Sequence, residues 1–169
     1  MSQSTILAIS LFFHLTATVI WVGGLLLTVL LIWPEVRRAL KQSPELYRLL
    51  HRLRLRFTPW GNLSLAVLIV TGLVQMSLNP NYDGLMQFNN PWSRVILLKH
   101  IALLGMIASG AVLQLWVFPA LERASLLIER GQGTADEYER LRRQEVRLTW
   151  LNAGLGVAVL AFSAWAGAL

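Results

Sequence analysis

The chain alternates between long apolar stretches and shorter stretches that carry nearly all of its charge. Residues 1–33, 58–79 and 148–169 contain no Asp, Glu, Lys or Arg, and residues 92–118 contain only two basic side chains near their start. A helix needs about 20 apolar residues to cross roughly 30 Å of hydrocarbon. The pattern predicts membrane-spanning helices over residues of about 5–33, 58–78, 92–118 and 149–168.

The polar connections between these helices differ in charge, and the difference predicts the topology. Residues 34–57 hold seven basic side chains and residues 119–147 hold six, whereas the connection from Asn79 to Pro91 has none. Cytoplasmic loops of membrane proteins are enriched in Lys and Arg. We therefore expect a multi-pass protein of the cell membrane, with both Arg-rich connections in the cytoplasm and both termini on the other side.

Helix signals extend into both Arg-rich connections. Pro44 suits the first turn of a helix, and the run from Thr134 to Glu137 is typical of a capping box after the break at residues 131–133. The second and fourth helices should thus begin in the cytoplasm, and Pro59 is expected to kink the second. The predicted fold is all-α: one transmembrane domain over residues 1–169, arranged as a four-helix bundle.

The two halves of the chain resemble each other. The first helix ends Ile-Trp-Pro34 and the third ends Val-Phe-Pro119, while Arg, Thr, Trp and Asn recur in the same order at the start of the second and fourth. This similarity predicts two related helical hairpins about a pseudo-twofold axis along the membrane normal.

Composition excludes several classes of protein. Of the 169 residues 55% are hydrophobic and only 14% are charged, which argues against a soluble domain or a disordered chain, and the absence of Cys excludes a disulfide scaffold. Thirteen of the fifteen basic residues lie in the two Arg-rich connections, so the net charge of +6 reports topology. The expected partner is the lipid bilayer and not a nucleic acid.

Two histidines lie within the predicted spans. His14 is 20 residues before Pro34 and His100 is 19 residues before Pro119, which puts both imidazoles at nearly the same depth in the outer half of the membrane. An ionisable side chain at such a depth is a candidate for function, although a histidine can also simply hydrogen-bond a neighbouring helix. We therefore interpret the pair as a ligand set.

Two imidazoles on opposite sides of a plane suit a b-type haem. Trp21 falls on the same helix face as His14, where it could pack on the macrocycle or simply in the core. Arg94 and Lys99 could pair with the haem propionates or extend to the membrane interface. The corresponding function is one-electron transfer, with a membrane redox partner or a quinone, as a homo-oligomer or as a subunit of a larger complex. The alternatives are copper transport or delivery through His14, His100 and one methionine, and a purely structural accessory subunit.

Several stretches resemble the copper-resistance protein D (CopD) family. They are His14 followed by Trp21-Val-Gly-Gly24, Leu53 to Phe57, Val70 to Leu73, Arg94 to Lys99, and Pro119-Ala-Leu121. The resemblance implies a four-helix membrane protein that handles copper.

The chain is more distantly similar to the oxygen-independent protoporphyrinogen oxidases of bacteria. His14, Trp21, Trp92 and Lys99 match that haem-binding family, whereas Leu-Leu-Thr-Val-Leu stands here in place of its Tyr-Leu-Pro-Arg-Leu. This similarity implies a third function, the oxidation of a porphyrinogen.

Overall fold

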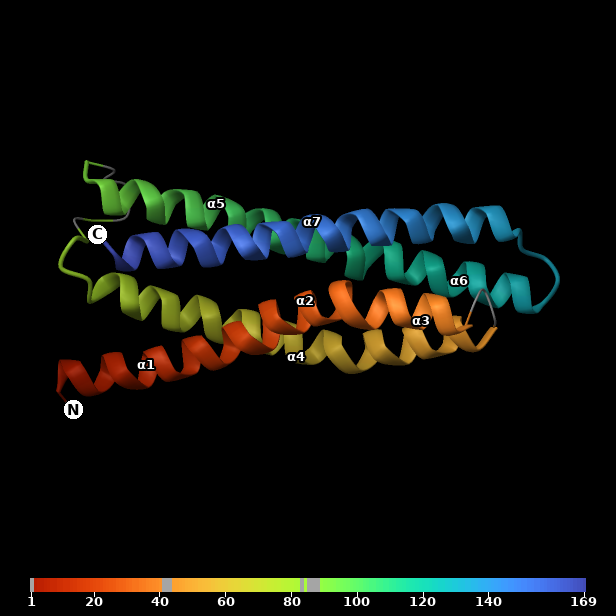
Figure 1. Ribbon diagram of the computed structural model, residues 1–169, viewed down its shortest axis with the longest axis horizontal. Helices are drawn as coiled ribbons and strands as arrows, with labels where there is room; N and C mark the ends of the chain where they lie inside the picture. Colours follow the sequence, from red (N-terminus) through yellow and green to blue (C-terminus); the bar gives the residue numbers. More distant parts are fainter. Residues whose placement is uncertain (1, 41–43, 83, 85–88) are drawn as a thin grey trace.

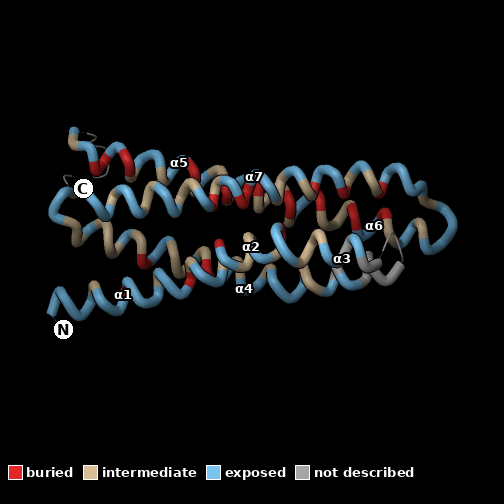
Figure 2. Tube along the Cα trace, in the orientation of Figure 1, coloured by how far each residue is buried: buried red, intermediate tan, exposed pale blue. Residues whose placement is uncertain are grey.

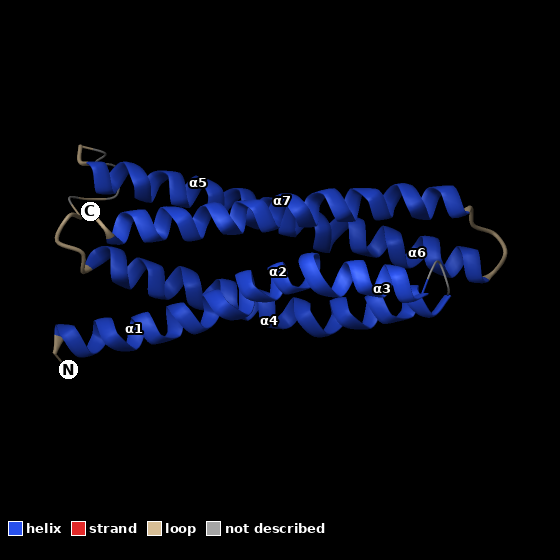
Figure 3. Ribbon diagram, in the orientation of Figure 1, coloured by secondary structure: helices blue, strands red, loops and turns tan. Residues whose placement is uncertain are grey.

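The computed structural model describes residues 2–40, 44–82, 84 and 89–169. Within them the backbone is helical except at short loops, which lie at the ends of the molecule (Figure 3). Four stretches are long and apolar enough to cross a membrane: Gln3–Glu35, Arg52–Ser77, Pro91–Glu129 and Ala135–Gly167. The prediction of an all-α protein with four membrane-spanning helices is confirmed.

The first span is one helical rod with two local changes of hydrogen-bond register. Ser2 caps its start, because the Ser2 hydroxyl accepts a hydrogen bond from the Thr5 amide at 3.2 Å. The rod consists of α1 (Gln3–Thr18), the π-helical segment η1 (Val19–Gly23), α2 (Gly24–Leu27), the π-helical segment η2 (Thr28–Ile32) and α3 (Trp33–Leu40).

The second and fourth spans are single helices that begin in the Arg-rich connections, as predicted. They are α4 (Pro44–Ser77), which continues through Pro59, and α7 (Ala135–Gly167). The third span comprises α5 (Pro91–Val112), the π-helical segment η3 (Leu113–Val117) and α6 (Phe118–Glu129). An Asn90–Ser93 capping box starts α5, with Pro91 at its first position.

Two of the π-helical segments occupy equivalent places in the two halves of the chain. Segment η2 ends two residues before Pro34, and η3 ends two residues before Pro119. Proline has no amide hydrogen and its ring crowds the carbonyl four residues earlier, so a proline inside a long helix disturbs the register of the preceding turn. The shared feature supports the repeat, whereas the pseudo-twofold axis stays a prediction.

The turn between α6 and α7 matches the predicted break, with one correction. Gly131 has a φ of +70°, a conformation that glycine adopts without strain. A Cβ atom at Gly133 would lie 2.8 Å from the Ile128 amide nitrogen, so only glycine fits there. Thr134 is the N-cap of α7, but its side chain makes no capping hydrogen bond. The predicted capping box is therefore wrong: the backbone begins the helix at Thr134 without it.

Helix α1 packs along α4 and helix α5 packs along α7 (Figure 1). The two chain ends lie at one end of the molecule, and the Arg-rich ends of the helices lie at the other. In each span at most 28% of the most apolar window is buried, and the outer faces of the bundle are largely exposed (Figure 2). These apolar outer faces are the surface expected to contact lipid.

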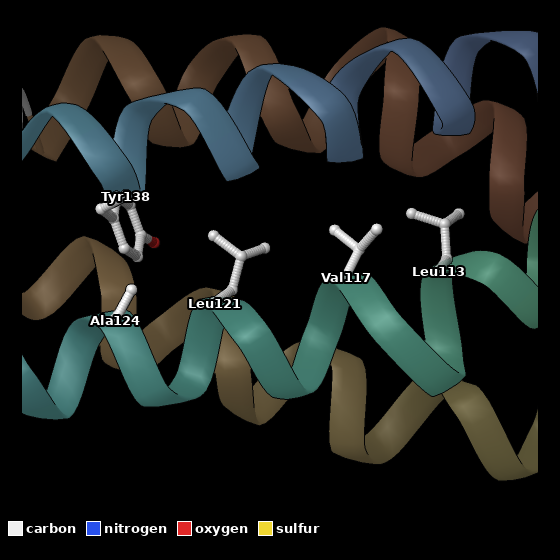
Figure 4. Packing of buried hydrophobic residues seen from close by; sticks show 5 residues of the cluster. All are labelled: Leu113, Val117, Leu121, Ala124 and Tyr138. Carbon is white, nitrogen blue, oxygen red and sulfur yellow. The ribbon is translucent and has the colours of Figure 1, made fainter.

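The largest described buried apolar cluster lies near the Arg-rich end. Leu113, Val117, Leu121 and Ala124 project from η3 and α6 towards α7, where Ala124 faces Tyr138 (Figure 4). Their spacing of three and four residues forms one stripe on the helix. Polar contacts also join the helices: the Asn62 and Gln114 amides donate to each other at 3.2 and 3.1 Å, and Asn152 donates to the Met106 carbonyl at 3.4 Å.

Candidate functional site

His14 is held by a polar contact between α1 and α4. Its Nδ1 atom lies 2.8 Å from the Thr71 hydroxyl, which itself lies 2.6 Å from the Val67 carbonyl. The helices approach closely at this point, because a Cβ atom at Gly72 would lie 3.6 Å from the Cε1 atom of the His14 ring. The imidazole is therefore fixed in place between two spanning helices.

The hydrogen-bond pattern assigns the tautomer of His14. A hydroxyl group has one hydrogen, and that of Thr71 is directed at the Val67 carbonyl, which only accepts. The Thr71 oxygen must then accept a hydrogen bond from Nδ1–H of His14. The Nε2 atom keeps its lone pair, which is the arrangement found in metal-binding histidines whose other nitrogen is fixed by an outer partner.

A second contact strengthens the same junction. The Ser10 hydroxyl donates to the Thr71 carbonyl at 3.1 Å, and the Gln75 amide reaches Ser10 at 3.5 Å. The sequence analysis missed Ser10, Thr71 and Gln75. The signal that identifies them is their spacing: Ser10 and His14 are four residues apart on one helix, and Thr71 and Gln75 are four apart on the next.

His100 has the same tautomer in a different setting. Its Nδ1–H donates to the Ile96 carbonyl of its own helix at 2.7 Å, so in the neutral imidazole Nε2 is the nitrogen that keeps a lone pair. The side chain is exposed on the surface of α5, whereas His14 is half-buried against α4. The two imidazoles thus present the same nitrogen but sit in different surroundings.

Lys99, the neighbour of His100, faces the interior. The buried residues of α5 follow a spacing of three and four, and Lys99 continues this stripe between Val95 and Ala102. Lys99 is also 20 residues before Pro119, as His14 is before Pro34, so Lys99 and His14 occupy equivalent positions in the repeat.

The other two predicted site residues lie apart from each other. Arg94 is exposed in the first turn of α5. Trp21 lies in η1 against α4, where a Cβ atom at Gly61 would be 3.7 Å from its ring. Among the residues that the structure describes, no three or more His, Cys, Asp or Glu side chains are grouped so that they could hold a metal ion. Asp83, Met86 and the His51 side chain lie outside the described part.

A partly open cavity of about 560 Å³ occupies the half of the bundle towards the Arg-rich end. All four spans line it, through residues within 20–33, 53–65, 106–118 and 145–152. Its described lining includes Trp21 but none of His14, Arg94, Lys99 and His100. The polar junction at His14 is therefore separate from the cavity. Of the predicted site residues, Trp21 borders the cavity.

Comparison with known proteins agrees with one of the two resemblances. A sequence profile of the family described as Copper resistance protein D (CopD) matches residues 51–166, about two thirds of the chain. The chain belongs to the CopD family. Searches of curated proteins and of solved structures gave no match.

Membership of the CopD family fits the copper alternative and gives no support to the haem interpretation. The matched residues include Arg94, Lys99 and His100, whereas His14 and Trp21 precede them. With four apolar spans in addition, the protein is a multi-pass integral membrane protein. The similarity to protoporphyrinogen oxidases and the role as an accessory subunit stay predictions from the sequence.

Proposed function

We propose that this CopD-family protein transports or delivers copper, and that His14 is its principal copper ligand in the membrane. The observation that carries the proposal is the Thr71 contact, which fixes the His14 ring and leaves Nε2 with its lone pair. Neutral imidazole is a good ligand for copper. In the predicted topology His14 belongs to the outer half of the membrane, so the ion would meet it on the side of the chain termini.

His100 is the second proposed ligand. It lies at nearly the same predicted depth and also presents Nε2. Its exposed position on α5 suits a site at which an ion arrives or departs, since transfer needs ligands that release the ion as readily as they take it.

Copper flux into proteoliposomes tests this proposal. The purified protein is reconstituted, and uptake of copper(II) is followed with and without ascorbate, so that both oxidation states are offered. We expect His14→Ala to abolish uptake and His100→Ala to reduce it severalfold. His51→Ala is the matched control, because it removes the one histidine outside the predicted spans. Equal uptake by wild type and His14→Ala would refute the assignment.

Haem binding, with electron transfer to a redox partner or quinone, is the second candidate. One observation favours it: in both membrane histidines Nδ1 is hydrogen-bonded, which leaves Nε2 as the nitrogen available for axial ligation. The visible spectrum of the purified protein decides between the two. A Soret band that is lost in both His14→Ala and His100→Ala supports haem binding. If wild-type protein purified from haem-supplemented cells shows no Soret band, this candidate is refuted.

A further inference from the structure

Three charged side chains are buried together at the Arg-rich end of the bundle. Arg54 of α4 donates from Nε to Glu145 of α7 at 2.9 Å, and Arg142 lies 3.6 Å from the other Glu145 oxygen. The side chains of Arg142, Glu145 and Arg54 are only 5%, 10% and 15% exposed. Two guanidinium groups thus share one carboxylate, which leaves a buried excess of one positive charge.

The hydrogen-bonding capacity of this cluster is also incomplete. Among the described residues, both terminal nitrogens of Arg142 and the Oε2 atom of Glu145 lack a hydrogen-bond partner, whereas Nη2 of Arg54 forms an ion pair with Glu145 Oε1 at 2.8 Å. Buried N–H groups of a charged side chain are costly to leave unpaired. The cluster is therefore suited to an additional acceptor that carries negative charge.

The cluster adjoins the large cavity. Arg54 and Glu145 line it directly, and the Arg142 guanidinium lies 4.9 Å from the ring centre of Trp33, which lines it as well. The rest of the lining is mainly apolar, from residues such as Leu65 and Ile107. A ligand that fills this space needs an anionic group at one end and an apolar body.

The depth of the cluster identifies the source of such a ligand. Arg54 and Glu145 each lie four residues before the start of an apolar span, at Thr58 and Thr149. At about 1.5 Å per residue, this places them about 6 Å beyond the hydrocarbon. The bilayer measures about 30 Å across its hydrocarbon and about 40–45 Å with its headgroups. Arg54 therefore lies at the level of the lipid phosphates, and Arg142, one helical turn further out, reaches this level through its contact with Glu145.

We propose that the cavity binds one anionic phospholipid from the leaflet on the Arg-rich side. Its phosphate accepts hydrogen bonds from Arg54 and Arg142, and an acyl chain occupies the apolar cavity between the two hairpins. Basic pockets between transmembrane helices are known places for anionic headgroups. The site is separate from the His14 junction and does not depend on the proposed copper function.

Native mass spectrometry of the detergent-purified protein tests this proposal. The probes are phosphatidylglycerol, phosphatidylcholine with the same acyl chains, and inorganic phosphate. We expect one phosphatidylglycerol per chain, bound at least about fivefold more tightly than phosphatidylcholine, because each basic residue near the headgroups contributes about that factor. Arg142→Gln should remove the preference, and Arg143→Gln, an exposed neighbour on the same helix, should retain it.

Two further variants keep the test decisive. Glu145→Gln removes the competing carboxylate and should raise the affinity for phosphatidylglycerol, whereas a purely structural role of Glu145 predicts a loss. Gly24 lines the cavity and has open space at its Cβ position, so Gly24→Phe should fill the cavity and expel the lipid. Gly154→Phe, at an exposed glycine that also has open space, is the matched control.

The outcomes that overturn the proposal are specific. Equal affinity for the two lipids, or equal lipid binding by Gly24→Phe and Gly154→Phe, means that only annular lipid is bound. Displacement of phosphatidylglycerol by millimolar inorganic phosphate, with no effect of Gly24→Phe, identifies a site for a free anion. If Glu145→Gln fails to fold, the Gly24→Phe comparison decides alone.

Discussion

At the residue scale, His14 shows what a sequence can and cannot predict about a membrane site. A histidine within an apolar span is an evident candidate, and the structure adds the reason for its orientation, the Thr71 hydroxyl on the neighbouring helix. Thr71 was not predicted because a threonine in an apolar helix usually bonds its own backbone, as Thr71 also does with Val67. Only the packing of α1 against α4 brings the two side chains together.

Thr71→Val should lower the affinity for copper about tenfold, because loss of an outer hydrogen-bond partner of a ligating histidine typically costs about 10- to 100-fold. Valine has nearly the shape of threonine but cannot accept from Nδ1–H, so the ring loses its fixed tautomer. Thr71→Ser keeps the hydroxyl and should bind copper nearly as wild type does. Competition of copper(II) with a chromophoric chelator measures both; equal affinities of the two variants would contradict the role of Thr71.

At the element scale, the helices were predictable and their ends less so. Apolar length gave the four spans, and helix signals gave the continuation of α4 and α7 beyond the membrane. The π-helical segments were not predicted. Segments η2 and η3 each end two residues before a proline, which disturbs the turn that precedes it, whereas no proline follows η1 directly. The capping box failed since a matching motif does not ensure that the threonine side chain turns towards the amide.

Gly133→Ala should destabilise the protein by about 1–3 kcal/mol, because the new methyl group would overlap the backbone of Ile128 in the turn between α6 and α7. Gly154→Ala, on an exposed helical face with open space, should be neutral or slightly stabilising. Thermal unfolding in detergent, followed by loss of helical circular dichroism, compares the two. Equal midpoints of thermal unfolding for Gly133→Ala and Gly154→Ala would show that the turn accommodates a Cβ atom at Gly133 without cost in stability.

At the scale of the whole molecule, charge along the sequence predicted the arrangement of the ends. Both termini lie at one end of the bundle and the Arg-rich ends of the helices at the other (Figure 1).

The predicted pairing of His14 with His100 depended on the rotation of α5 about its axis, which two sequence positions do not define. The structure turns Lys99 towards the interior and leaves His100 exposed. The buried charge cluster escaped the sequence analysis for a related reason: Arg54 comes from the first Arg-rich connection and Arg142 and Glu145 from the second, so only the packing of α4 against α7 brings the three side chains together.

Reporter fusions test the predicted topology. Alkaline phosphatase is active only outside the cytoplasm, and a fluorescent protein exported in unfolded form stays dark there. Because the Arg-rich connections are expected to remain in the cytoplasm, phosphatase fused to either terminus should be active, and the fluorescent protein inserted at Gly131 should be bright. A bright fluorescent protein at both termini would invert the assigned orientation.

The copper content of the protein is the most direct test of the central claim, that His14 binds copper in the membrane. Wild type, His14→Ala and His51→Ala are loaded with copper(II), freed of loose metal by gel filtration, and measured by elemental analysis. The account predicts about one copper ion per chain in wild type and in His51→Ala, and loss of that copper in His14→Ala. Copper retained in full by His14→Ala, or absent from the wild type, would contradict it.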